Sequence, residues 1–191
     1  MEPALYGRRP VLRAYFPEGM MRRVKLDDGT PALIRPIRPD DADALVEGFA
    51  HLSEESRRAR FLGSVACLTP DMVRYFTDVD GVDHIALVLT VEDPSQPTGE
   101  RGLAVARCVR AAPGSEEAEF ACTVADEWQG HHIGHQLMSA LVEAAKSQGI
   151  RRFRGVMAAD NARMLHIMHE LGREVDRSYE PGIVSALYEL H

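Results

Sequence analysis

The sequence predicts a mixed α/β protein of the α+β kind, with helices on both faces of a mixed, mostly antiparallel β-sheet. Three observations support this prediction. Residues 84–125 contain three apolar, strand-like segments joined by short turns, which is typical of an antiparallel meander. Residues 133–190 then alternate helical and strand-like segments. Shorter helical segments between residues 39 and 79 can cover the other face of the sheet.

The elements before residue 80 are predicted from turn and capping residues. Residues 1–22 show no steady periodicity, and we expect an extension that packs late or pairs with a partner. Asp28-Gly29 lies between "RRVKL" and "PALIRPIR" and predicts a hairpin. Three helices are predicted from the residues that begin them. Pro39 and two aspartates begin the first, over 38–53. Ser53 and Ser56 begin the second, over 53–63, and Thr69 and Pro70 begin the third, over 69–79.

The later elements follow from hydrophobic periodicity. Strands are predicted over 84–92, 102–111 and 117–125, with a loop at 94–102 and a turn at Pro113-Gly114. A long helix is predicted over 133–149, with Ile133, Leu137, Ala140, Leu141 and Ala144 on one face and Gly149 at its end. Residues 151–158 predict a strand, 160–172 a helix that ends at a glycine, and 183–190 the last strand.

Composition limits the classes of function. The chain has 191 residues, of which 45% are hydrophobic and 27% charged, as in soluble globular proteins. No apolar run approaches the ~20 residues that span a bilayer, and the first thirty residues lack the apolar stretch of a secretory signal. We therefore expect a cytoplasmic protein that does not bind membranes.

Charge and cysteine content exclude further classes. The net charge of −7 argues against nucleic acid as the main partner, because binding phosphates needs a concentrated basic surface. The clusters "RRARF" (57–61) and "RRFR" (151–154) are interpreted as solvated positions. Cys67, Cys108 and Cys122 are widely separated and lack CxxC spacing, so we expect them to be reduced.

One turn stands out in front of the long helix. Residues 126–137 read "DEWQGHHIGHQL", in which glycines punctuate the approach to the helix. The first N–H groups of a helix have no intrahelical acceptor. Such a turn is therefore either a plain connection or a seat for an anion.

The segments "EFACTVADEWQGHHIGHQLMSALVEAAKSQGI" and "NARMLHIMHELG" resemble the core of the GNAT superfamily of acyl-CoA-dependent N-acyltransferases. The most specific match is to the segment Gln/Arg-x-x-Gly-x-Gly, which in that family grips the pyrophosphate of coenzyme A. Here it corresponds to Gln129, Gly130, His131, His132, Ile133 and Gly134. "RPIRPDD" and "LSEESRRARF" resemble more narrowly the catalytic domain of bacterial protein lysine acetyltransferases, the kind that modify acyl-CoA synthetases.

The resemblance covers roughly residues 32–190. It divides the chain into an extension with a first strand (1–31) and a GNAT domain (32–191). It implies acetyl-CoA as the acyl donor, without a metal, and a protein substrate such as an acyl-CoA synthetase. The assembly expected for the protein is either a monomer or a homodimer.

The resemblance also implies where the cofactor lies. Cys122, Thr123 and Val124 would pair their backbone with the pantetheine amides, and the pyrophosphate seat would extend to His135. From the second helix, Asn161 and Met164 would also contact the cofactor.

The chain departs from the family at two positions. His132 replaces the middle glycine of the pyrophosphate segment, where we expect it to adopt helical angles. Met168 stands where many members carry a tyrosine that protonates the leaving thiolate.

Acyl transfer to an amine needs a general base, because a lysine with a pKa near 10.4 is protonated at neutral pH. Glu119 is the candidate, since it lies among apolar residues on the strand before the turn. Partial burial there would raise its pKa. The alternative for Glu119 is an ordinary cross-strand charge pair. Glu116 and Glu117 are expected to lie solvated in the preceding turn.

Other chemistries are less favoured. His131 and His135 stand four residues apart, as metal ligands on a helix do, but no third ligand and no HExxH glutamate is evident. Cys122 is interpreted as a small buried residue and not as a nucleophile. The spacing of Met164 and Met168 is more typical of core packing than of a substrate site.

The sequence therefore predicts an acetyl-CoA-dependent N-acetyltransferase with direct transfer to an amine, for which we expect the side chain of a protein lysine. Two alternatives stay open. One is an acyl-CoA-binding regulatory module with little or no turnover, and the other is an acetyltransferase for a small amine such as a polyamine or an antibiotic.

Overall fold

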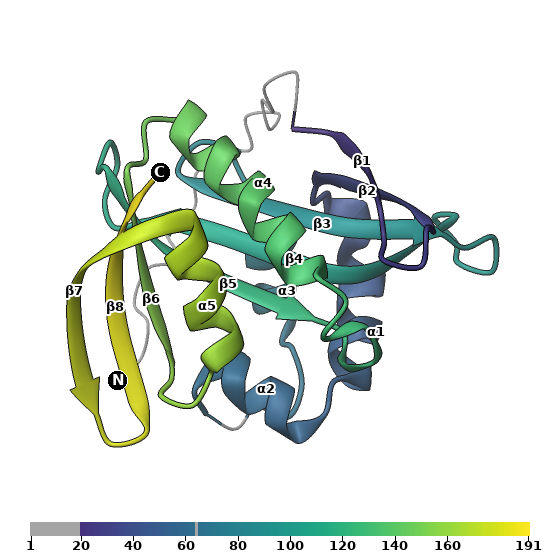
Figure 1. Cartoon of the computed structure of the whole chain (residues 1–191). Helices are drawn as coiled ribbons and strands as arrows, with labels where there is room; N and C mark the ends of the chain where they lie inside the picture. The colour runs from purple at the N-terminus through teal and green to yellow at the C-terminus, as the bar shows by residue number, and fades with distance from the viewer. Residues whose placement is uncertain (1–19, 64) are drawn as a thin grey trace.

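The computed structural model describes residues 20–63 and 65–191 (Figure 1). Within these residues eight strands form one sheet in the order β1-β2-β3-β4-β5-β6-β8-β7. All neighbours are antiparallel except β5 and β6, which are parallel. The predicted mixed, mostly antiparallel sheet is confirmed. Most of the predicted N-terminal extension lies outside the described residues.

The strands are β1 (Arg22–Lys25), β2 (Pro31–Pro36), β3 (His84–Glu92), β4 (Glu100–Arg110), β5 (Glu117–Val124), β6 (Arg152–Ala158), β7 (Gly172–Glu180) and β8 (Ile183–Leu190). The helices are α1 (Ala42–His51), α2 (Glu54–Phe61), α3 (Pro70–Thr77), α4 (Ile133–Ser147) and α5 (Ala162–Leu171). Short 3-10 helices span η1 (Pro39–Asp41) and η2 (Asp126–Trp128).

Hydroxyl side chains fix where two helices begin. Ser53 Oγ accepts the backbone N–H of Ser56 at 3.1 Å before α2, and Thr69 Oγ1 accepts that of Met72 at 3.3 Å before α3. These bonds satisfy N–H groups that the first helical turn leaves without an acceptor. Both helices therefore start where the sequence predicts.

Strand β7 was not predicted, although α5 does end at the predicted glycine, Gly172. Gly172 both ends α5 and opens β7 in extended backbone, where an added Cβ would lie 2.8 Å from the carbonyl oxygen of Glu189. Residues 173–180 are mostly charged or exposed, and the register shifts between Glu174 and Asp176. Such an edge strand shows little of the apolar alternation by which strands are recognised.

The first hairpin joins the main sheet. β1 pairs with β2 through a turn in which Asp28 Oδ1 accepts the N–H of Thr30 at 2.9 Å and Gly29 has φ +87°. The expected domain boundary between residues 31 and 32 thus falls within β2, a strand of the main sheet.

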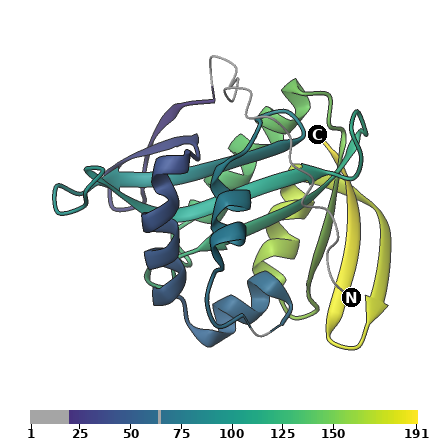
Figure 2. The same cartoon turned by 180° about the vertical axis from the view of Figure 1, so that it is seen from behind.

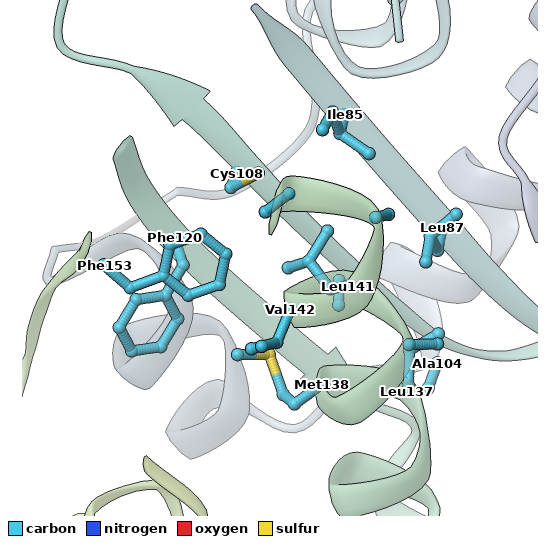
Figure 3. Close-up of a cluster of buried hydrophobic side chains, with 14 of the residues drawn as sticks. Ile85, Leu87, Ala104, Cys108, Phe120, Leu137, Met138, Leu141, Val142 and Phe153 are labelled. Atoms are coloured by element: carbon cyan, nitrogen blue, oxygen red, sulfur yellow. The ribbon is translucent and has the colours of Figure 1, made fainter. Parts of the chain in front are cut away.

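The core lies between the sheet and α4. The buried face of α4 packs on β3 and β4, and Figure 3 shows Leu137, Met138 and Leu141 among the apolar side chains of the strands. Helix α5 lies on the same side as α4, whereas α1, α2 and α3 cover the opposite face (Figures 1 and 2). The predicted helices on both faces are confirmed. None of the described helices has the length and apolar character to cross a membrane.

Candidate active site

Strands β5 and β6 pair only briefly. Glu117–Glu119 face Arg152–Arg154 in the parallel ladder, but β5 continues to Val124 and β6 to Ala158. Figure 1 shows the two strands diverging beyond this point, next to the start of α4. Within the described chain, the β6 side of residues 120–124 therefore has no ladder partner. Its backbone groups can pair with an extended ligand that carries amides.

The turn before α4 leaves backbone N–H groups without an intrahelical acceptor. The first α-helical bond runs from the N–H of Gln136 to the carbonyl of His132 at 3.0 Å, so the N–H groups of Ile133 and Gly134 precede it. Gly130 has φ +85°, and no atom lies within 4 Å of the position of an added Cβ. These N–H groups and the positive end of the helix dipole fit a pyrophosphate.

His132 has a left-handed backbone. Its φ of 55° and ψ of 6° overturn the expectation of helical angles and explain why a glycine suits this position. The imidazole Nδ1 lies 2.9 Å from a carboxylate oxygen of Asp27, in the turn between β1 and β2. The side chain is thus held by the first hairpin.

The other two histidines of the turn point to different partners. The ring of His131 meets that of Trp128 edge-on, with centroids 5.9 Å apart. His135 Nε2 lies 3.2 Å from a carboxylate oxygen of Glu170 on α5. Among residues 20–63 and 65–191, no group of three or more His, Cys, Asp or Glu side chains could hold a metal ion.

Gln129 and Asn161 both make hydrogen bonds within the protein. Gln129 Nε2 donates to Ser56 Oγ and Asp126 Oδ1, each at 3.0 Å, and Gln129 Oε1 accepts from Arg163 at 2.8 Å. Asn161 Oδ1 caps α5. Gln129 thus ties the turn to α2 and α5, and Arg163, which the sequence reasoning missed, places an exposed cation beside the predicted pyrophosphate seat.

The residues at the end of β5 have separate environments. Burial raises the pKa of the Cys122 thiol to about 12, so the thiol is protonated at neutral pH and is no nucleophile. Thr123 lines a cavity under α1 and α2. Val124 approaches Gly134, since an added Cβ on that glycine would lie 3.5 Å from Val124.

The two methionines of α5 belong to the core. Met164 is partly buried against it, and Met168 is fully buried. A contact of Met164 with a cofactor stays a prediction. A buried thioether at residue 168 has no proton to donate.

Glu119 is exposed, so the expectation of partial burial is wrong. Its carboxylate interacts electrostatically with Arg60 of α2, which places it on the sheet face that carries the first three helices. Its register partner, Arg154, is instead bound by Glu117 at 2.7 Å. Within the described chain, no cation lies at ion-pair distance from Glu119. Glu119 is therefore not the cross-strand charge pair that we considered.

This geometry corrects two further expectations. Glu117 lies in β5 and is paired with Arg154, whereas we expected it solvated in a turn. Arg60, in the cluster interpreted as solvated, is mostly buried and rests over aromatic rings. Apolar neighbours on a helix that packs on the sheet explain its burial.

Residues 32–174 match the acetyltransferase (GNAT) domain family. The chain is 36% identical over 149 residues to acetyltransferase Pat of Mycolicibacterium smegmatis, an alignment that covers 78% of this chain and 43% of that protein. It is 32% identical over 149 residues to acetyltransferase PA5475 of Pseudomonas aeruginosa, with 77% of each protein covered. The chain thus spans less than half the length of Pat.

Solved structures show the same fold. The GNAT domain of S. lividans PAT superposes with a TM-score of 0.81 at 30% identity, covering 92% of this chain and 100% of that one. YncA from Salmonella typhimurium, whose structure holds its cofactor acetyl-CoA, superposes with a TM-score of 0.65 at 16% identity and supports the fold alone. It covers 84% of this chain and 94% of that one. From these likenesses and from the opening between β5 and β6, we conclude that the chain belongs to the GNAT family of acetyltransferases.

Proposed function

We propose that this acetyltransferase moves the acetyl group of acetyl-CoA to the side-chain amine of a lysine in a cytoplasmic protein. The similarity to Pat and to the GNAT domain of S. lividans PAT supports a protein acceptor. One observation carries the chemistry: Glu119 is an exposed carboxylate, without an ion-pair partner in the described chain, where β5 and β6 separate.

The donor would lie along two parts of the chain. Backbone N–H groups of residues 130–134 would hold the pyrophosphate at the start of α4. Residues 122–124 of β5, which have no ladder partner on the β6 side, would pair with the amides of the pantetheine arm. This arrangement directs the thioester into the opening, towards Glu119.

Glu119 would then act as the general base. Its carboxylate takes a proton from the lysine ammonium, and the neutral amine attacks the thioester carbonyl directly to form a tetrahedral intermediate. The nitrogen of this intermediate loses a second proton to water, and the C–S bond breaks to release the coenzyme A thiolate. The protonated Cys122 thiol supports direct transfer over a covalent enzyme intermediate. Because Met168 cannot donate a proton, we expect water to protonate the leaving thiolate.

The proposal is tested by incubating the purified chain with acetyl-CoA and one of several acceptors: acyl-CoA synthetases, polyamines or aminoglycosides. Thiol release measures turnover, and intact mass and peptide mapping identify an acetylated lysine. We expect acetylation of a protein lysine. Transfer to small amines alone would contradict the protein acceptor, and no turnover with any acceptor would favour a regulatory module.

Glu119→Gln is the decisive variant. It should lower kcat by about 10²–10³ and leave acetyl-CoA affinity unchanged, because it removes the base but not the donor site. Glu116→Gln is the matched control, since Glu116 is exposed in the turn before β5. Equal turnover of Glu119→Gln and wild type at neutral pH would assign the base to another group.

A further inference from the structure

A cavity of about 110 Å³ lies between the sheet and the layer of α1, α2 and α3, on the face seen in Figure 2. Its wall is largely apolar and includes the rings of Phe61 and Phe76. Three arginines also line it: Arg35 from β2, Arg60 from α2 and Arg107 from β4. The cavity therefore combines an apolar wall with three arginines and two carboxylates, those of Asp41 and Glu100.

The charge of one arginine is balanced within the protein. The guanidinium of Arg35 lies 2.7 Å from Asp41 and 2.8 Å from Glu100, and its side chain is only 3% exposed. A buried guanidinium is normally accommodated in this way, by carboxylates at hydrogen-bond distance.

Arg107 has only neutral partners among the described residues. Its Nη1 donates to the carbonyl of Phe76 at 3.2 Å and lies 3.2 Å from His84 Nε2. Burial, together with the charge of Arg107, lowers the pKa of His84 to about 3, so this imidazole is neutral at pH 7. Arg107 is 6% exposed and lies 4.5 Å from the centroid of the Phe76 ring.

Arg60 also forms no ion pair within the described residues, although the carboxylate of Glu119 interacts with it electrostatically. Its guanidinium lies 4.8 Å from the centroid of the Phe61 ring and 5.7 Å from that of Phe76, and no described carboxylate is at ion-pair distance. Arg60 and Arg107 thus share one aromatic ring while their like charges repel. An aromatic face balances a cation only in part.

The electrostatics of the pair are unfavourable in the free protein. Burial lowers the pKa of Arg60, and burial together with Arg60 lowers that of Arg107 to about 9. Arg107 still carries its charge at neutral pH. Two buried guanidinium groups without a carboxylate at ion-pair distance are costly unless an anion completes the site.

The cavity adjoins the predicted reaction centre. Thr123, which lines it, follows Glu119 on the same face of β5. The guanidinium of Arg60 lines the cavity and also interacts electrostatically with Glu119 and Cys122. A group that extends from the reacting atoms past Arg60 therefore enters the cavity.

From this arrangement we infer that Arg60 and Arg107 form a binding subsite for a carboxylate borne by one of the two reactants. An apolar wall with two guanidinium groups suits a short carbon chain that ends in a carboxylate. The carboxylate would belong either to the far end of a dicarboxylic acyl chain or to the acceptor. The inference rests on the proposed function for the position of the reacting atoms.

Direct binding of succinate, as the probe, tests the subsite without any turnover. We expect calorimetry of the full chain at low salt to detect binding, and Arg60→Met to weaken it roughly ten- to hundredfold, the equivalent of one charge-assisted hydrogen bond. Arg60→Lys should restore part of the affinity. Arg58→Met is the matched control, because Arg58 lies on the same helix with its side chain 67% exposed and paired with Glu54.

Two kinetic arms then identify the source of the carboxylate. If the donor supplies it, Arg60→Met lowers kcat/KM for succinyl-CoA far more than for acetyl-CoA. If the acceptor supplies it, the same variant lowers kcat/KM for lysine peptides with a glutamate beside the lysine more than for peptides with glutamine. Arg107→Met is a second variant, and a melting curve shows whether it folds.

The outcomes separate this inference from the proposed function. Succinate binding without any lysine acetylation would refute the protein acceptor and leave the subsite standing. Absence of succinate binding, or binding that Arg60→Met does not weaken, would overturn the subsite. An unchanged Arg60→Met variant in both kinetic arms would equally overturn its place in the reaction.

Discussion

Replacing His132 by glycine or by alanine tests the backbone of the turn before α4. With φ 55° and ψ 6°, His132 occupies the left-handed region, which costs a non-glycine residue about 1–2 kcal/mol. Glycine removes this strain but loses about 0.4–1 kcal/mol through its freer unfolded chain. Both variants lose the exposed contact with Asp27, worth about 0–1 kcal/mol.

The strain therefore reverses the usual order of stability of glycine and alanine variants. His132→Gly should be more stable than His132→Ala by about 1 kcal/mol, or about 2–4 °C in Tm for a chain of this size. At an ordinary helical position alanine is the more stable by about 1 kcal/mol. Gly48 in α1, which is exposed with open space around it, provides that control through Gly48→Ala.

Urea denaturation and thermal melting of the three variants measure this order. An alanine variant at residue 132 that is more stable than the glycine variant would refute the left-handed assignment. The same variants test the ionic role of the imidazole. Because the imidazole of His132 contacts the carboxylate of Asp27, we expect it to have no ionic contact with acetyl-CoA. The affinity for acetyl-CoA should therefore depend on pH in the same way in wild type and His132→Gly between pH 6 and pH 8.

Two further predictions concern stability. Burial raises the pKa of Asp41, but hydrogen bonds from Arg35 and the backbone outweigh this effect and hold the pKa below 3.8. The stability that Asp41 contributes is therefore present above pH 3.8 and is lost as the pH falls through the lower pKa of the folded state. Asp41→Asn should lower the free energy of unfolding by about 3–5 kcal/mol at pH 7 and make it depend less on pH in the acid range. Equal urea midpoints of this variant and wild type at pH 7 would contradict the prediction. Gly155→Ala should lower the free energy of unfolding by about 1–3 kcal/mol, because its Cβ would lie 2.6 Å from the Phe120 ring and from Met157 Cε. An unchanged Tm would contradict this and show that the neighbouring side chains move aside.

Local patterns account for the parts of the fold that could be predicted. β3 and β8 begin and end at the predicted residues, because each is an apolar run between turn residues. β7 was missed because its charged side chains face solvent at the edge of the sheet. It pairs with β8 across the two-residue turn Pro181-Gly182, a local hairpin signal that the prediction of a single last strand over 183–190 did not use.

The candidate site divides in the same way. The turn before α4 could be found because its glycines and the following helix are contiguous in sequence. The exposure of Glu119 could not be predicted, because it depends on where β5 and β6 separate. Arg60 and Arg107 were missed because a helix and a strand bring them together over Phe76. The one available signal was an arginine inside the apolar run "GLAVARCVRA".

Backbone hydrogen exchange with and without saturating acetyl-CoA tests the central claim most directly, namely that the donor lies between β5 and β6 with its pyrophosphate at the start of α4. We predict that acetyl-CoA slows exchange in residues 122–124 and 130–135 and leaves the exposed turn at 94–99 unchanged. Saturated binding that protects other segments and leaves these two unprotected would contradict the account.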